Sequence, residues 1–454
     1  MADEREVATV PRRPAIGRSW IAFVVGLAAL LLGLLVGPRV PNDRQNEFGV
    51  FNVPLFGPFG VSLSIDSTDF MRFARDPSRL LEPHNIRQSR PGLILVAGVL
   101  TLPFYPMRYL VVWLGLRGER TDIEPQKMAN SLLDNAPAYL PYIMLNVAAL
   151  VLSFHFFRKI CATVATRSDV ATDLTVASIG LLIVANDVVK AFVWSPHTQM
   201  FNILVPIFGV YAVLRSWAGA ARDRRFAVWM GLATGLGMTA YWVFAVLVPC
   251  LVLPALIDLV WRASPGERLR LIGNIGLFLV LAAAPMALWY VFVLASTGDF
   301  HASETRDNGM LIWMFDALSV GPGALAARLF DNAHVLINQA KPQAVAIAAA
   351  ALLTLLAVIA TAGRSLAVLR RAGGVVIAGL FVSVLVLIFY TCVGWLVPRL
   401  AYAMLPPLIV AIGALAVAAV GELPPYGRRA LASAYLVLVL AQMVFEVVKD
   451  GPWY

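Results

Sequence analysis

Residues 19–37 read SWIAFVVGLAALLLGLLVG. This run carries no charge and has about the 20 residues that a helix needs to cross the hydrocarbon core of a bilayer. It is too long for the apolar core of an ordinary signal peptide, and no clear small-x-small cleavage site follows it. We therefore predict a first membrane helix that stays attached, preceded by a cytoplasmic tail at residues 1–18.

Comparable apolar runs recur along the whole chain. The 454 residues are 59% hydrophobic and only 14% charged, whereas soluble domains contain ~25% charged residues. We predict an all-α polytopic membrane protein with about 11 transmembrane helices in a single domain, residues 19–454. The predicted spans are 19–37, 138–157, 174–194, 200–217, 226–244, 245–261, 271–295, 343–362, 374–396, 402–420 and 430–447.

The basic residues predict the orientation of these helices. A net charge of +9 could indicate nucleic-acid binding, but most basic residues lie in short loops between apolar runs, which is typical of membrane orientation. We therefore expect a multi-pass protein of the bacterial inner (plasma) membrane, with a cytoplasmic N-terminus, an external C-terminus and no nucleic-acid partner. The clusters that set this orientation are Arg158/Lys159/Arg167, Arg215/Arg222/Arg224/Arg225, Arg262/Arg268/Arg270, Arg364/Arg370/Arg371 and Arg428/Arg429.

One further apolar segment, residues 91–116, must be reconciled with that orientation. A single crossing there would move all five basic clusters to the outside. Pro103 and Pro106 interrupt its middle and favour an irregular path. We predict a re-entrant, interfacial or hairpin segment inside a large first external loop, residues 38–137, which also contains short helices. A second external loop is expected at residues 296–342.

The first external loop contains a pair of acidic residues with helical spacing. Asp66, Phe70 and Ala74 fall four apart on one helix face, and Asp69 lies on the neighbouring strip. Two carboxylates about one turn apart suit general-base chemistry, because each raises the proton affinity of the other. The alternative is that Asp66 only caps a short helix beginning at Ser67.

Basic residues follow the acidic pair. Arg87 and Arg90 stand shortly before Pro91, and arginine is well suited to binding phosphate. The alternative is a solvated loop with surface ion pairs. Near the C-terminus, Arg399 is the only charge between Arg371 and Glu422. It is expected either to hold an anionic lipid headgroup or to extend its side chain to the membrane surface.

Three further groups are candidates for substrate binding. Asp187 and Lys190 lie three residues apart in the apolar run 174–194. They would form either a structural ion pair or a ligand site. Lys190 is also a candidate for binding phosphate. His197 belongs to the external turn 194–199. Gln199 and Asn202 open the next helix and would either bind a sugar or satisfy the helix end.

The sequence gives no sign of a bound metal or cofactor. The cysteines are scattered through apolar runs, and the spacing of the histidines matches no metal pattern. No metal site and no cofactor are expected, although a requirement for a divalent metal stays open.

These motifs resemble the glycosyltransferase-C superfamily, in which the first external loop carries Asp-Glu-x-x-Tyr-x-x-x-Ala. Here Asp66 and Ala74 match, while Ser67 replaces the Glu and Phe70 replaces the Tyr. The segment SRPGL at 89–93 is similar to the family's Pro-Pro-Leu. The stretch 399–406 is similar to its Arg-Tyr-x-x-x-x-x-Pro, with Leu400 in place of Tyr, and 199–202 to its Gln-x-x-Asn.

The resemblance implies an enzyme that transfers a hexose or pentose from a polyprenyl-phosphate lipid to a glycan or lipid acceptor on the external face. It implies Asp66 as the base, with Asp69 in a second role, and Arg399, Arg90, Arg87 and Lys190 as donor-phosphate ligands. Substrate contacts would come from Asp187, His197, Gln199, Asn202 and Phe70. The alternatives are a transporter or lipid flippase that uses Asp187 and Lys190 as a relay, and a non-catalytic subunit of a polysaccharide assembly.

Overall fold

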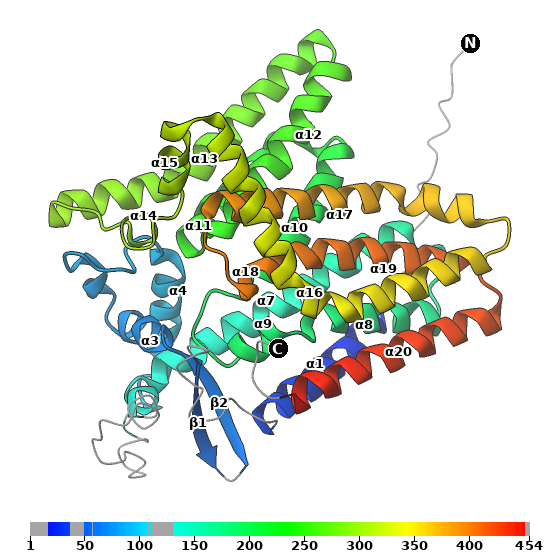
Figure 1. The fold of residues 1–454 in the computed structure, drawn as a ribbon, viewed down its shortest axis with the longest axis horizontal. Coiled ribbons are helices and arrows are strands. Elements are labelled where there is room, and N and C mark those ends of the chain that lie inside the picture. Colours follow the sequence, from blue (N-terminus) through cyan, green and yellow to red (C-terminus); the bar gives the residue numbers. More distant parts are fainter. Residues whose placement is uncertain (1–16, 37–49, 57, 108, 110–129, 450–454) are drawn as a thin grey trace, which may run out of the picture.

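The computed structural model describes residues 17–36, 50–56, 58–107, 109 and 130–449. Long helices lie side by side in it, and short elements gather at one end of the bundle (Figure 1). The long helices are α1 (Ser19–Val36), α7 (Ala136–Val164), α8 (Val170–Val184), α10 (Phe201–Trp217), α11 (Arg224–Ala240), α12 (Leu247–Trp261), α13 (Pro265–Thr297), α16 (Pro322–Ala360), α17 (Ser365–Val393), α19 (Leu405–Glu422) and α20 (Pro425–Val448).

The all-α polytopic membrane class is confirmed at this level. Among the described residues, eight helices are long and apolar enough to cross a membrane, and three shorter ones are also apolar. Every predicted span overlaps one of the long helices, but α11 is in neither of these two groups, so the count of 11 spans stays a prediction. The short elements are β1 (Val50–Phe56), β2 (Phe59–Ser64), α3 (Ser67–Arg75), η2 (Pro77–Leu81), α4 (Pro91–Thr101), η3 (Leu102–Phe104), α9 (Asp187–Phe192), η4 (Ala220–Arg222), η5 (Trp242–Val246), α14 (Ser303–Arg306), α15 (Ile312–Val320), α18 (Pro398–Ala401) and η6 (Tyr402–Met404).

The centre of the bundle is α19. Buried residues make up 83% of its most apolar stretch, compared with 17% in α13. Small residues let its neighbours approach, as is usual between membrane helices. A Cβ added at Gly413 would lie 2.6 Å from the ring of Phe157, and one added at Gly379 of α17 would lie 2.6 Å from the carbonyl oxygen of Pro407. Helix α19 is therefore the core helix on which α7, α8, α16 and α17 pack.

In three segments the structure differs in detail from the prediction. The predicted span 174–194 is two helices, α8 and α9, because the chain breaks at Ala185 and the side chain of Asn186 caps α9 by accepting from the backbone N–H of Val189. The loop expected at 296–342 is largely helical, since α16 begins at Pro322. The described part of the predicted loop 38–137 contains short helices, as predicted, but also the antiparallel hairpin of β1 and β2.

Residues of the predicted basic clusters form ion pairs at helix ends. Arg371 pairs with Glu422 at 2.9 Å, joining the start of α17 to the end of α19, and Arg428 of α20 pairs with Asp169 before α8 at 2.5 Å. Arg222 pairs with Asp258 of α12 at 3.0 Å and with Glu267 of α13 at 2.9 Å. These pairs link helix ends that the positive-inside rule assigns to the cytoplasm. We call this end the basic end.

The described part of the segment 91–116 stays at the opposite end, next to α3. A Cβ at Gly92 would meet the backbone of Thr239, in the last turn of α11, and one at Gly98 would meet the carbonyl of Ala74. Helix α4 thus lies against two helix ends that face away from the basic end. Residues 108 and 110–116 lie outside the described residues, so a path without a single crossing stays a prediction.

We predict that the basic end is cytoplasmic and the α3 end is external. Cysteine replacements at two exposed positions, Ser78 beside α3 and Arg429 in α20, distinguish the two sides. A membrane-impermeant maleimide added to sealed spheroplasts should label Ser78→Cys, whereas Arg429→Cys should react only after lysis. If only Arg429→Cys were labelled in sealed spheroplasts, the orientation would be the opposite of the predicted one.

Candidate active site around Asp66

Asp66 stands where β2 ends and α3 begins. Its side chain makes no capping hydrogen bond to α3. It points instead toward Arg87 and His197, so a capping role does not account for this carboxylate. Ser195 holds the two segments together, because its hydroxyl accepts from the backbone N–H of Ser64 at 2.9 Å and lies 2.6 Å from the hydroxyl of Ser67.

A buried arginine bridges the two predicted carboxylates. Nη2 of Arg87 lies 2.7 Å from Oδ1 of Asp66 and 3.8 Å from Oδ2 of Asp69. Its guanidinium also lies 4.7 Å from the ring centre of the fully buried Phe70. The two carboxylates with helical spacing therefore face one cation, and the ring of Phe70 packs against it.

His197 binds the other oxygen of Asp66. Its Nδ1 accepts a hydrogen bond from the backbone N–H of Thr198 at 2.9 Å, so in the neutral ring the proton is on Nε2. Nε2 lies 3.4 Å from Oδ2 of Asp66 and donates to it. The ring is buried between Phe70 and Phe192, at centroid distances of 5.6 Å and 4.8 Å.

These contacts give the carboxyl groups of Asp66 and Asp69 different pKa values. Burial alone would raise the pKa of Asp66, but the hydrogen bond from His197 and the charge of Arg87 outweigh it and hold the pKa well below the usual range. Burial raises the pKa of Asp69, and Arg87 offsets only part of that increase. Burial lowers the pKa of His197 to about 4. Near neutral pH, Asp66 is thus ionised and His197 neutral.

A cavity of about 360 Å³ opens beside Asp66 and His197. Predicted site residues on its wall come from four separate parts of the chain: Asp66, Arg87, Arg90, His197, Gln199 and Arg399. Ile86, Tyr241, Asp307, Asn308, Met310, Trp395 and Leu400 complete the lining. Three guanidinium groups and two carboxylates therefore share a cavity with several large apolar side chains.

Arg399 and Arg90 line this cavity over aromatic rings. The guanidinium of Arg399 lies 5.7 Å from the ring centre of Phe192, and that of Arg90 lies 5.4 Å from Tyr241. Among the described residues, no carboxylate lies within ion-pair distance of Arg399, and its buried Nε has no hydrogen-bond partner. The guanidinium of Arg399 can therefore bind an anion in this cavity.

The other predicted residues do not line this cavity. Asn202 is buried, donates to Gln199 at 2.6 Å and accepts from the hydroxyl of Tyr390 at 2.5 Å, so it orients Gln199. Asp69 lines a neighbouring cavity of about 460 Å³ with Arg72 and Arg75. Asp187 lines a separate cavity, which we call the second cavity.

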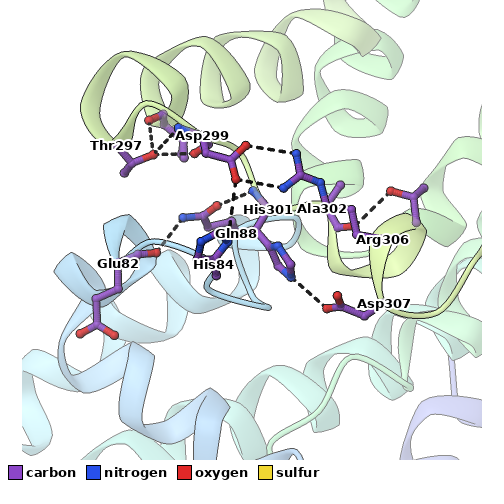
Figure 2. A network of polar contacts seen from close by, with 11 residues as sticks. Glu82, His84, Gln88, Thr297, Asp299, His301, Ala302, Arg306 and Asp307 are labelled. Atoms are coloured by element: carbon purple, nitrogen blue, oxygen red, sulfur yellow. Dashed lines mark hydrogen bonds and ion pairs between the residues drawn. The ribbon is translucent and has the colours of Figure 1, made fainter.

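The second predicted loop, residues 296–342, contributes residues that were not predicted from the sequence. Gln88 donates to the carbonyl of Glu82 at 3.0 Å and accepts from the backbone N–H of His301 at 2.8 Å. His301 in turn lies 2.9 Å from the carboxylate of Asp307, which lines the cavity (Figure 2). The polar residues clustered between 297 and 308 were the available signal for this loop.

Asp299 strengthens the same connection between the two loops. It makes a double contact with Arg306, at 2.9 and 3.1 Å, and faces His84 at 3.9 Å (Figure 2). The two loops that line the cavity are thereby tied to each other. Across the described part of the chain, no group of three or more His, Cys, Asp or Glu residues could hold a metal ion.

Comparisons with models of known protein families, with curated proteins and with solved structures found no match to this chain.

The buried neutral His197 predicts a loss of stability in mild acid. Its pKa of about 4 in the folded protein lies below the ordinary ~6.5, so its neutral form stabilises the fold above pH ~6.5. This contribution is lost as the pH falls from ~6.5 toward 4. Between pH 7 and pH 5 the loss is about 2 kcal/mol.

Melting temperatures of the wild type and of His197→Gln at pH 7 and pH 5 test this. Glutamine can still donate to Asp66 but does not titrate, so the variant should lose less stability between the two pH values. An equal loss in both proteins would assign the acid sensitivity to other groups.

Proposed function

We propose that this protein is an inner-membrane glycosyltransferase, which moves a sugar from a polyprenyl-phosphate donor to a glycan or lipid acceptor on the external face. The observation that carries the proposal is the cavity shared by the carboxylate of Asp66 and the guanidinium groups of Arg90 and Arg399. The resemblance of residues 66–74 and 399–406 to the glycosyltransferase-C superfamily supports the same function.

The donor phosphate would bind at Arg399 and Arg90. A guanidinium group binds phosphate through paired N–H donors, and Arg399 has no acidic partner among the described residues. Trp395, Met310 and Leu400 offer apolar surface for the first units of the polyprenyl chain. The same cations would stabilise the charge that develops on the departing phosphate.

The transfer itself requires a base. The acceptor hydroxyl attacks the anomeric carbon, Asp66 takes its proton, and the bond from that carbon to the phosphate oxygen breaks. The electron pair leaves with polyprenyl phosphate, and the anomeric centre is inverted. His197 and Gln199, which Asn202 holds, line the same cavity and would contact the sugar.

Donor binding would also activate Asp66. In the absence of donor, Arg87 and His197 occupy both oxygens and make this carboxylate a weak base. A phosphate in the cavity competes for the guanidinium of Arg87, and loss of that contact raises the pKa of Asp66. Asp69, whose pKa is already raised, is the second candidate base.

Asp66→Asn is expected to lower sugar transfer by at least ~10²-fold while donor binding is retained. Asparagine preserves the size and part of the hydrogen bonding but cannot accept a proton near neutral pH, and a positioned base contributes at least that much. Asp69→Asn should cost less. The assay is transfer from a polyprenyl-phosphate donor in detergent, with melting temperature as folding control.

Asp76→Asn is the matched control, since Asp76 is an exposed acid of the same loop that pairs with Arg79 at 3.2 Å. Its transfer rate should equal that of the wild type. Near-normal transfer by Asp66→Asn would remove Asp66 as the base, and a greater loss in Asp69→Asn would give Asp69 that role.

Arg399→Ala is expected to weaken donor binding ten- to a hundred-fold, the range of one charge-assisted contact of ~1.5–3 kcal/mol. Arg399→Lys should recover only part of the affinity, because an ammonium group lacks the paired donors. Arg429→Ala, at the exposed basic end, should bind donor normally. Unchanged donor affinity in a stable Arg399→Ala protein would leave Arg399 with a purely structural role.

A further inference from the structure

A second charged cavity, of about 270 Å³, lies at the start of α9. Asp187, the first residue of α9, lines it, whereas Phe192, the last, packs on His197 and Arg399 of the candidate active site. The proposed transfer reaction uses none of the charged residues around this second cavity. They come from α9 and from the end of α20.

Charges of both signs meet there. The ammonium group of Lys449 contacts the carboxylate of Asp187 and lies 2.9 Å from that of Glu446, while the ammonium group of Lys190 donates to the carbonyl of Lys449. Asp187 and Glu446 are each only 3% exposed. Two buried carboxylates thus share the ammonium group of Lys449.

The carboxylates keep unused capacity for N–H donors. Gln442 donates to Oε1 of Glu446 at 2.8 Å. Oδ1 of Asp187 and Oε2 of Glu446 are buried, and among the described residues each faces the ammonium group of Lys449 alone, so each carboxylate oxygen keeps a further lone pair for a donor. An additional cationic N–H donor would therefore be accommodated between them.

The cavity opens toward lipid at the level of the headgroups. Val345 and Phe445 line it and are 71% and 54% exposed on the outside of the bundle. Phe445 lies 20 residues along α20 from Pro425 at the basic end, and 20 helical residues span about 30 Å, the thickness of the hydrocarbon core. The break between α8 and α9 lies beside the cavity, and irregular backbone at this depth is tolerated where it lines one.

We propose that this cavity binds the headgroup of a zwitterionic phospholipid that carries a primary ammonium group. The ammonium group donates to Asp187 and Glu446, and the phosphate meets Lys190 and Lys449. A trimethylated ammonium group has no N–H to donate, and an anionic headgroup brings no cation for the two carboxylates. This site is separate from the proposed transfer of sugar and does not depend on it.

The test is native mass spectrometry of the full-length, delipidated protein titrated with short-chain phosphatidylethanolamine, phosphatidylcholine and phosphatidylglycerol. Phosphatidylethanolamine should bind at least tenfold more tightly than either of the others, because only its ammonium group can donate charge-assisted hydrogen bonds to Asp187 and Glu446. Glu446→Gln should remove most of that preference. Asp169→Asn, which changes a carboxylate in a cavity at the basic end, should keep it.

Equal binding of the ethanolamine and choline lipids by the wild type would overturn the proposal, as would a preference for the anionic lipid. So would an unchanged preference in Glu446→Gln at a wild-type melting temperature. If Glu446→Gln does not fold, Asp187→Asn serves the same purpose, and the lipid preference of the wild type already decides the question.

Discussion

The buried guanidinium of Arg87 is the constraint on which the candidate site depends. A buried cation is costly unless it is paired, and this one is compensated by Asp66, Asp69 and the face of Phe70. The contacts of Arg87 fix the position of the chain that follows α3, and they keep Asp66 ionised near neutral pH. An anion that competes for Arg87 would weaken its contact with Asp66 and raise the pKa of that carboxyl group. Anion binding and the proton affinity of Asp66 are thereby linked.

Helix α9 organises the end of the bundle opposite the basic end. Its last residue, Phe192, contacts the ring of His197 and the guanidinium of Arg399, while its first residue, Asp187, pairs with Lys449. Asn146 of α7 fixes the chain that follows, donating to the carbonyls of Phe192, Val193 and Ser195. Two cavities of different chemistry are thereby held apart by one short helix. One has an excess of arginine and suits an anion, and the other has balanced charge.

The sequence predicted the helices well because long apolar runs have few other structures available in a bilayer, and it predicted the approach of Asp66 to Asp69 because helical spacing is local. It could not predict that Asp187 pairs with Lys449, since this contact joins distant parts of the chain and depends on the packing of α20 against α8. The hairpin of β1 and β2 was missed because its residues are interrupted by Pro54 and Pro58. Asp307 was missed because a lone acid in a polar loop has no periodicity.

The central claim is that the cavity beside Asp66 receives the phosphate and the first isoprenoid units of a lipid-linked sugar. Photo-crosslinking with a polyprenyl-phosphate analogue that carries a diazirine near its phosphate, followed by peptide mapping, tests this claim directly. Labelling should be concentrated on Trp395, Met310 and Tyr241, which line that cavity, and unmodified polyprenyl phosphate should suppress it. Labelling confined to Val345 and Phe445 of the second cavity, or to the basic end, would contradict it.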